Sequence, residues 1–208
     1  MDNKKILNNF LISKSKEAAF QDYLNKLRDF NSHTNIVGKS TLINPWVSHI
    51  LDSLQILPFI QNKKFSILDM GTGAGLPGVV LSISGCKDVT LVDSNGKRIN
   101  FLKLIKKEMN LNANIILGRL ENLNNLKFDI ITSRALASLD KLLSYSQKFM
   151  KKNTLLIFLK GKTVNEELKE AQKKWIFQLQ KHKSISDSRG TLLIIKSLKK
   201  NDQNNSHC

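Results

Sequence analysis

The chain has 208 residues, is 41% hydrophobic and carries a formal net charge of +16. This is enough for one domain with a hydrophobic core and a short extension, and the lack of any run of about eighteen apolar residues excludes a membrane-spanning helix. Two cysteines and four scattered histidines exclude a disulfide framework and any recognisable metal-ligand spacing. The N-terminal segment holds only the short apolar run Phe10–Ile12, unlike a signal peptide, so we expect a cytoplasmic location.

The positive charge comes mainly from lysine, which supplies 28 of the 33 basic residues. A basic balance of this size favours a polyanionic partner, with RNA or DNA first. Asparagine and isoleucine are also abundant, and an A/T-rich genome would give the same bias without selection for binding. Charge alone leaves both interpretations open.

The first 62 residues are expected to form a helical extension. Within residues 16–30, apolar side chains recur at three- and four-residue spacing, which indicates an amphipathic helix. After a polar break we expect a second helix, with Asn44 as its N-cap and Pro45 at its first position. An apolar stripe from Trp46 to Leu57 would pack this helix on the rest of the chain.

Residues 63–198 are predicted to form an α/β domain, a doubly wound and mostly parallel sheet with helices on both faces. The expected strands are 65–70, 89–93, 114–117, 128–132, 154–159, 183–186 and 192–196, and the expected helices begin near Pro77, Lys97, Leu136 and Glu166. The last two strands would form a hairpin about residues 188–190. Residues 199–208 are expected to be a polar tail.

A glycine-rich turn follows the first expected strand. Gly71, Gly73 and Gly75 alternate with other residues between that strand and the helix near Pro77. Glycine permits positive φ and lets a ligand lie against bare backbone, while the following helix offers unpaired N–H groups. The pattern predicts a binding site at the carboxyl edge of the sheet.

The spacing of this turn distinguishes two classes of ligand. A dinucleotide site requires G-x-G-x-x-G, and Leu76 occupies the position of the last glycine. A G-x-G-x-G turn with an acid at the end of the next strand is the arrangement of methyltransferases. Asp93 lies twenty residues after Gly73 and ends the second strand, where its carboxylate can take both ribose hydroxyls of S-adenosylmethionine. The sequence therefore predicts this cofactor.

Polar residues also follow the later strands. Leu120 and Glu121 come after the third strand, where a backbone N–H and a carboxylate commonly hold the adenine of such a cofactor. Arg134 follows the fourth strand, where the reactive end of the cofactor is expected, and Lys160 follows the fifth. Each could be part of an ordinary polar loop, but their shared position at one sheet edge favours a site.

These residues resemble those of one family, the small-subunit ribosomal RNA guanine-N7 methyltransferases, also called glucose-inhibited division protein B or RsmG. The matching segments are Asn35-Ile-Val37, Trp46, His49-Ile-Leu-Asp-Ser-Leu54, Leu68-Asp-Met-Gly-Thr-Gly-Ala-Gly-Leu-Pro-Gly78, Asp93-Ser-Asn-Gly-Lys-Arg98, Phe101-Leu102, Ser133-Arg-Ala135 and Leu159-Lys-Gly161. The departures are Gly118, where the family often has a polar residue, and Gly96, which interrupts the start of a helix.

The resemblance implies methylation of guanine N7 in the 530 loop of 16S rRNA, at guanine 527 in standard rRNA numbering. It implies cofactor contacts at Gly71, Leu76, Leu120, Glu121 and Arg134. The implied partner is 16S rRNA or the assembling small ribosomal subunit, and we expect a monomer that needs no metal.

Guanine N7 has a free lone pair and no proton, so its methylation needs positioning and electrostatics but no general base. We expect catalytic roles for Arg134 and Lys160. Lys97, Arg98, Lys160 and Arg189 are expected to bind phosphates of the RNA substrate.

Two other functions stay open. A methyltransferase acting on a small molecule or a protein would share the cofactor site without needing the positive charge. A non-catalytic RNA-binding protein could retain the fold, although the intact glycines and Asp93 argue against a decayed site.

Overall fold

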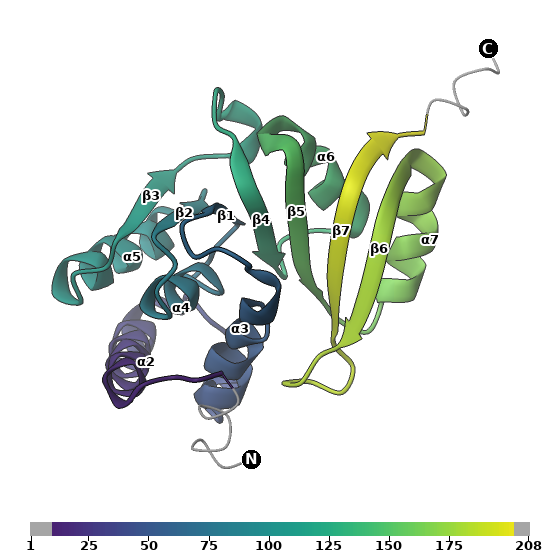
Figure 1. Cartoon of the computed structure of the whole chain (residues 1–208). Coiled ribbons are helices and arrows are strands. Elements are labelled where there is room, and N and C mark those ends of the chain that lie inside the picture. The colour runs from purple at the N-terminus through teal and green to yellow at the C-terminus, as the bar shows by residue number, and fades with distance from the viewer. Residues whose placement is uncertain (1–9, 202–208) are drawn as a thin grey trace.

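The computed structural model describes residues 10–201, which form one seven-stranded sheet with helices on both faces (Figure 1). The strands are β1 (Ser66–Met70), β2 (Asp88–Asp93), β3 (Ala113–Leu117), β4 (Phe128–Arg134), β5 (Met150–Lys160), β6 (Trp175–Lys183) and β7 (Thr191–Lys200). The longer helices are α2 (Lys14–Thr34), α4 (Gly78–Ile83), α5 (Gly96–Glu108), α6 (Leu139–Phe149) and α7 (Val164–Lys174). Shorter helical segments are Lys39–Leu42, Trp46–Leu51, α3 (Asp52–Leu54), Leu57–Phe59 and Leu120–Asn122.

The strand order is β3-β2-β1-β4-β5-β7-β6, so β1 lies inside the sheet and the chain reverses direction of winding between β1 and β4. Neighbouring strands from β3 to β5 are parallel, whereas β7 is antiparallel to both β5 and β6. This confirms the doubly wound, mostly parallel sheet. Ligands of such sheets bind at the carboxyl ends of the strands beside the reversal, which here is the edge that follows β1 and β4.

Each face of the sheet carries its own hydrophobic cluster because successive strand residues point to opposite faces. Ile67 of β1 packs in a cluster with α2, α4 and α5, while Leu68 and Met70 pack in a second cluster with α6 and α7. Both faces are covered, so the inner strands are apolar at almost every position. That is the pattern by which the parallel strands were predicted.

The expected helical extension is present and contacts the glycine-rich turn. Ser13 caps α2 by accepting a hydrogen bond from the N–H of Lys16. Tyr23 is fully buried, and its hydroxyl donates to the carbonyl oxygen of Ala74 at 2.9 Å. The extension therefore supports the turn directly, through a hydrogen bond formed across 51 positions of the chain.

The second helix of the extension differs from the prediction. Asn44 does act at its start, since the side chain accepts from the N–H of Val47. The following turn, Trp46–Leu51, is a π-helix, and only the short α3 continues it as an α-helix. Hydrophobic spacing indicates a helix but does not distinguish the wider π turn from an α turn.

The strand expected at residues 183–186 is wrong. Strand β6 ends at Lys183, and residues 184–190 form the loop that joins it to β7. The actual strand begins at Trp175, directly after α7. Its first half alternates, with Trp175, Phe177 and Leu179 less exposed than their neighbours, whereas residues 180–183 are exposed and polar because β6 lies at the edge of the sheet.

At the C-terminus, β7 continues to Lys200, two residues into the segment expected as a polar tail, and residues 202–208 lie outside the described residues. Among residues 10–201, no helix is long and apolar enough to cross a bilayer. The same part of the chain holds no cluster of three or more metal-ligating side chains.

Candidate active site

Two cavities lie at the carboxyl edge of the sheet. The smaller, of about 240 Å³, is lined by Gly71, Asp93, Arg98, Leu120, Glu121 and Leu136, among others. The larger, of about 630 Å³, includes Ser48, Asp52, Arg134, Lys160, Ser186 and Arg189 in its lining. The chain leaving β4 separates them, because residues 134 and 135 line the larger cavity and residue 136 lines the smaller.

The three glycines of the turn all have positive φ, but a side chain would meet a different environment at each. A Cβ on Gly71 would lie 2.4 Å from Leu136, and one on Gly75 would lie 2.3 Å from Val79. A Cβ on Gly73 would meet nothing within 4 Å. Close packing therefore requires glycine at position 75. Gly71 lies against the tip of the Leu136 side chain and lines the smaller cavity, and Gly73 faces open space that a ligand could fill.

Asp69 fixes the turn from beneath. Its carboxylate is fully buried and accepts hydrogen bonds from the hydroxyl of Thr72 at 2.6 Å and the N–H of Gly78 at 2.8 Å. Burial raises the pKa of Asp69 to about 7, although these two hydrogen bonds act in the opposite direction. Asp69 therefore links β1 to both ends of the turn, which is a structural role.

Asp93 ends β2 beside this turn, as predicted, and is 5% exposed. One carboxylate oxygen accepts from the N–H of Gly73 at 2.9 Å and from the guanidinium of Arg98 at 3.3 Å, and the other accepts from the N–H of Asn95 at 2.8 Å. A carboxylate has about four acceptor positions, so three are used. Arg98 makes the longest of these bonds and is 40% exposed, which makes it the easiest partner to replace.

Leu120 and Glu121 both line the smaller cavity, on the short helix that follows β3. The carboxylate of Glu121 accepts a hydrogen bond from the hydroxyl of Tyr145 at 3.0 Å. Hydrogen bonds to its own backbone and to Tyr145 lower the pKa of Glu121, so it is ionised at neutral pH. Asp93 and Glu121 give this cavity two carboxylates.

Leu76 does not join these residues. Its side chain is 2% exposed within the hydrophobic core, and its N–H donates to the carbonyl oxygen of Thr72. The side chain of Leu76 therefore belongs to the hydrophobic core, and its contact with the cofactor stays a prediction.

Arg134 lies in the larger cavity, on the other side of the separating segment from Asp93. Its guanidinium donates to the carbonyl oxygen of Ser48 at 2.9 Å and to the carboxylate of Asp52 at 3.0 Å. A third contact, 3.5 Å long, joins it to Nδ1 of His49. Arg134 therefore faces the larger cavity and also joins β4 to the N-terminal extension.

His49 is buried, and Nε2 of its ring has no hydrogen-bond partner among the described residues. Burial, and then the positive charge of Arg134, lower the pKa of His49 to about 4. The ring is therefore neutral at physiological pH and can accept from the guanidinium at Nδ1.

Lys160 lines the larger cavity but its ammonium group is engaged. It donates to the carbonyl oxygen of Ala137 at 2.7 Å and pairs with the carboxylate of Glu167 at 2.6 Å, and its side chain is 8% exposed. Glu167 also accepts from the N–H of Leu139 at the start of α6. These contacts hold β5, α6 and α7 together, so Lys160 has little freedom to bind a phosphate.

The remaining predicted substrate-binding residues are dispersed. Lys97 is exposed at the start of α5, and Arg98 faces Asp93 in the smaller cavity. Arg189 lies in the β6–β7 loop at the rim of the larger cavity, where it pairs with Asp187 at 3.1 Å and is 73% exposed. Of the four residues expected to bind phosphates, Lys160 and Arg189 line the larger cavity, Arg98 lines the smaller one, and Lys97 lies in neither lining.

Asp52 and Ser186 of the larger cavity were not predicted as site residues. They lie 134 positions apart in the chain, and the hydroxyl of Ser186 donates to the carboxylate of Asp52. Asp52 lies on the polar side of the expected helix and within the segment His49–Leu54 that resembles the family, and these were its signals in the sequence. Ser186 fell in a segment that was assigned to a strand.

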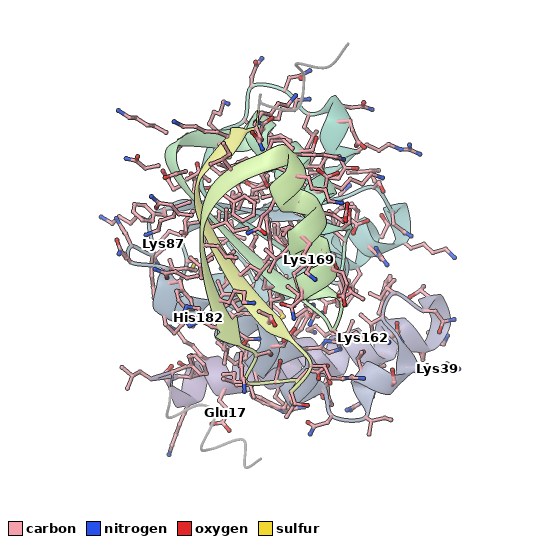
Figure 2. The ribbon with its side chains drawn as sticks, turned by 90° about the vertical axis from the view of Figure 1, so that its right-hand side faces the viewer. Glu17, Lys39, Lys87, Lys162, Lys169 and His182 are labelled. Carbon is pink, nitrogen blue, oxygen red and sulfur yellow. The ribbon has the colours of Figure 1, made fainter. Side chains whose placement is uncertain are left out.

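The positive charge is not confined to this edge. Figure 2 shows Lys87 before β2, Lys169 on α7 and Lys39 in the N-terminal extension well apart, with nitrogen-tipped side chains projecting on several sides. Its distribution therefore does not mark one face as an RNA-binding surface, and the influence of genome composition stays open.

The fold and the arrangement of the carboxyl edge define the class I S-adenosylmethionine-dependent methyltransferases. The chain resembles the ribosomal protein L11 methylase of Lactobacillus delbrueckii subsp. bulgaricus, with a TM-score of 0.58 and 17% identity over 69% of this chain and 75% of that one. It also resembles M. jannaschii TYW2, solved in complex with AdoMet, with a TM-score of 0.54 and 18% identity over 71% and 74% of the two chains.

Sequence comparison assigns the family. Residues 16–202 match the model of the GidB family, described as rRNA small subunit methyltransferase G, and the chain belongs to this family. It is 40% identical to the ribosomal RNA small subunit methyltransferase G of Orientia tsutsugamushi (strain Ikeda), covering 90% of this chain and 94% of the relative. The protein of the same name from Caulobacter vibrioides (strain NA1000 / CB15N) is also 40% identical, over 83% and 81% of the two chains.

Proposed function

We propose that this protein uses S-adenosylmethionine to methylate N7 of a guanine in the 530 loop of 16S rRNA, at guanine 527 in standard numbering. The relatives named above are small-subunit rRNA methyltransferases. The observation that carries the proposal is the hydrogen bond from the N–H of Gly73 to Asp93, beside the space left open at Gly73, in a chain of that family.

The smaller cavity and the turn beside it fit this cofactor in three respects. Asp93 and Glu121 line the cavity and offer a buried carboxylate to ribose hydroxyls and an exposed one on the adjoining loop. Gly73 lies outside the lining, but its N–H is bound to Asp93 and a side chain there would project into open space. The ribose hydroxyls would replace the long, exposed contact of Arg98 with Asp93. When bound, S-adenosylmethionine supplies a methyl group on a positively charged sulfur.

The larger cavity is proposed to receive the target nucleoside. N7 lies on a base edge that stacking buries, so the guanine must leave its stack or lie in a loop. Serine hydroxyls, Asp52 and Arg134 line the cavity, which suits a base and its phosphate. The nitrogen attacks with its own lone pair, so the protein has only to align it and to exclude water.

The experiment is to map methylated nucleotides in 16S rRNA from cells with and without this gene. Borohydride and aniline treatment cleaves RNA at N7-methylguanine, because the methylated ring is cationic. We expect cleavage in the 530 loop that depends on the gene. A methyl group on a ribose oxygen or an exocyclic amine, or on a small molecule or protein instead, would contradict the proposal.

A further inference from the structure

The π turn at Trp46–Leu51 presents an unusual set of groups to the larger cavity. Its apolar residues Trp46 and Ile50 are buried in the core, so its polar side faces Arg134. The N–H of Asp52 reaches back five residues to the carbonyl oxygen of Val47, as a π turn requires. Such turns are rare and are frequent at functional sites.

Two residues of this turn and the first residue of α3 contact one guanidinium. The carbonyl oxygen of Ser48, the ring of His49 and the carboxylate of Asp52 all lie within 3.5 Å of Arg134. A guanidinium is planar and its donors are fixed in direction. Acceptors on one rigid turn therefore determine where the remaining donors of Arg134 point.

The other oxygen of Asp52 faces the β6–β7 loop. It accepts from the hydroxyl of Ser186 and from the side-chain amide of Gln55 at 2.9 Å. The amide oxygen of Gln55 in turn accepts from the N–H of Ile185 at 3.2 Å. Asp52 thus connects Arg134 at the end of β4 with the loop that forms the rim of the cavity.

We propose that Asp52 is a positioning residue for methyl transfer, an inference that rests on the proposed function. It holds the Arg134 guanidinium beside the segment that separates the two cavities, and it anchors the β6–β7 loop to the same point. RNA seated on this loop then meets an arginine whose orientation is already set. Preorganised donors of this kind lower a barrier because they need no rearrangement during the reaction.

The test is a double-mutant cycle of Asp52→Asn and Arg134→Lys, measured as kcat and KM for methylation of 16S rRNA. We expect Asp52→Asn to lower kcat at least about fivefold while changing KM less than about twofold. In the Arg134→Lys background the same change should lower kcat less than about twofold, because residues that act together are not additive. Asp129→Asn is the control, since it removes a carboxylate paired with Lys151 at 2.8 Å at the opposite edge of the sheet.

An unchanged kcat in Asp52→Asn, or an equal loss in both backgrounds, would overturn the inference. If Asp52→Asn fails to fold, Ser186→Ala provides a milder test, because it removes the hydrogen bond from the β6–β7 loop to Asp52. We expect it to lower kcat about threefold, and only while Arg134 is present; full activity would again overturn the inference.

Failure of the proposed function would look different. The parent would then leave 16S rRNA unmethylated. A urea-unfolding cycle of the same variants would still decide whether Asp52 acts through Arg134. Strictly additive shifts of the denaturation midpoint would overturn the coupling.

Discussion

The two cavities at the carboxyl edge are built in different ways. The glycine turn and Asp93 of the smaller cavity come from one short strand–turn–helix–strand unit, residues 66–93, and are joined mainly through backbone groups. The larger cavity collects side chains from the N-terminal extension, β4, β5 and the β6–β7 loop. The glycine turn and Asp93 are therefore encoded locally, and residues from 118 to 145 complete the lining of their cavity. The larger cavity has no such local unit and exists only after distant segments pack together.

The largest effect is expected from a substitution in the glycine turn, at the position where a side chain would project into open space. We expect Gly73→Val to weaken S-adenosylmethionine binding at least about a hundredfold, because the side chain would occupy the open space beside Asp93. The fold should survive, at a cost of about 1–2 kcal/mol for positive φ. Calorimetry and thermal unfolding measure the two effects.

Gly78→Val is the matched control. A Cβ at Gly78 would lie 2.2 Å from Leu91 and 2.8 Å from Asp69, so this variant should lose about 3 kcal/mol of stability. If Gly73→Val binds the cofactor like the parent, the open space beside Gly73 is not part of the cofactor site.

The next effect concerns the larger cavity. We expect Arg134→Lys to lower kcat/KM for rRNA at least about tenfold, equal to about 1.4 kcal/mol, because an ammonium cannot keep all three contacts of the guanidinium. The thermal midpoint should also fall by about 2–4 °C, since these contacts join β4 to the N-terminal extension. Full activity together with an unchanged midpoint would show Arg134 to be a solvated cation.

The two halves of the site should also respond oppositely to pH. The folded-state pKa of Asp69 is raised to about 7, so the folded protein binds more protons than the unfolded chain and stability falls as pH rises toward 7. The folded-state pKa of His49 is lowered to about 4, so the unfolded chain binds more protons and stability rises with pH up to about 6.5. Between about pH 4.5 and 6.5 the two contributions oppose each other.

Substituting Asp69 or His49 alone should reveal the contribution of the other residue to the pH dependence of stability, measured by urea unfolding between about pH 4.5 and 6.5. In Asp69→Asn the free energy of unfolding should rise with pH, and in His49→Gln it should fall, each with a slope change of at most about 1.4 kcal/mol per pH unit. Slopes equal to the parent's in both variants would contradict these pKa shifts.

The smallest effect is expected on RNA binding, from Arg189 at the rim of the larger cavity. Arg189 is exposed and paired with Asp187, so Arg189→Gln should weaken RNA binding only slightly and reduce its salt slope by about one. Asp187→Asn, which frees the guanidinium, should strengthen binding at low salt. Unequal loss among unrelated RNA sequences would indicate base recognition instead.

The same contrast explains how much the sequence could predict. The glycine turn, Asp93 and the sheet were predictable because strand periodicity and positive-φ glycine act over a few residues. The engagement of Lys160 by Glu167 and of Arg134 by Asp52 was not, since each depends on how separate helices pack against the sheet. Strand β6 was missed because it follows α7 at Trp175 without an intervening loop, and because its residues 180–183 are polar and exposed.

The smaller cavity is proposed to bind the cofactor and the larger one to receive the RNA. The most direct test of this central claim measures S-adenosylmethionine affinity and rRNA methylation in two variants. Asp93→Ala alters the smaller cavity, and replacing residues 186–189 by glycine alters the rim of the larger one. We predict that Asp93→Ala loses cofactor binding, whereas the loop variant binds the cofactor within about threefold of the parent and yet fails to methylate 16S rRNA. Full cofactor affinity in Asp93→Ala, or full methylation by the loop variant, would contradict this account.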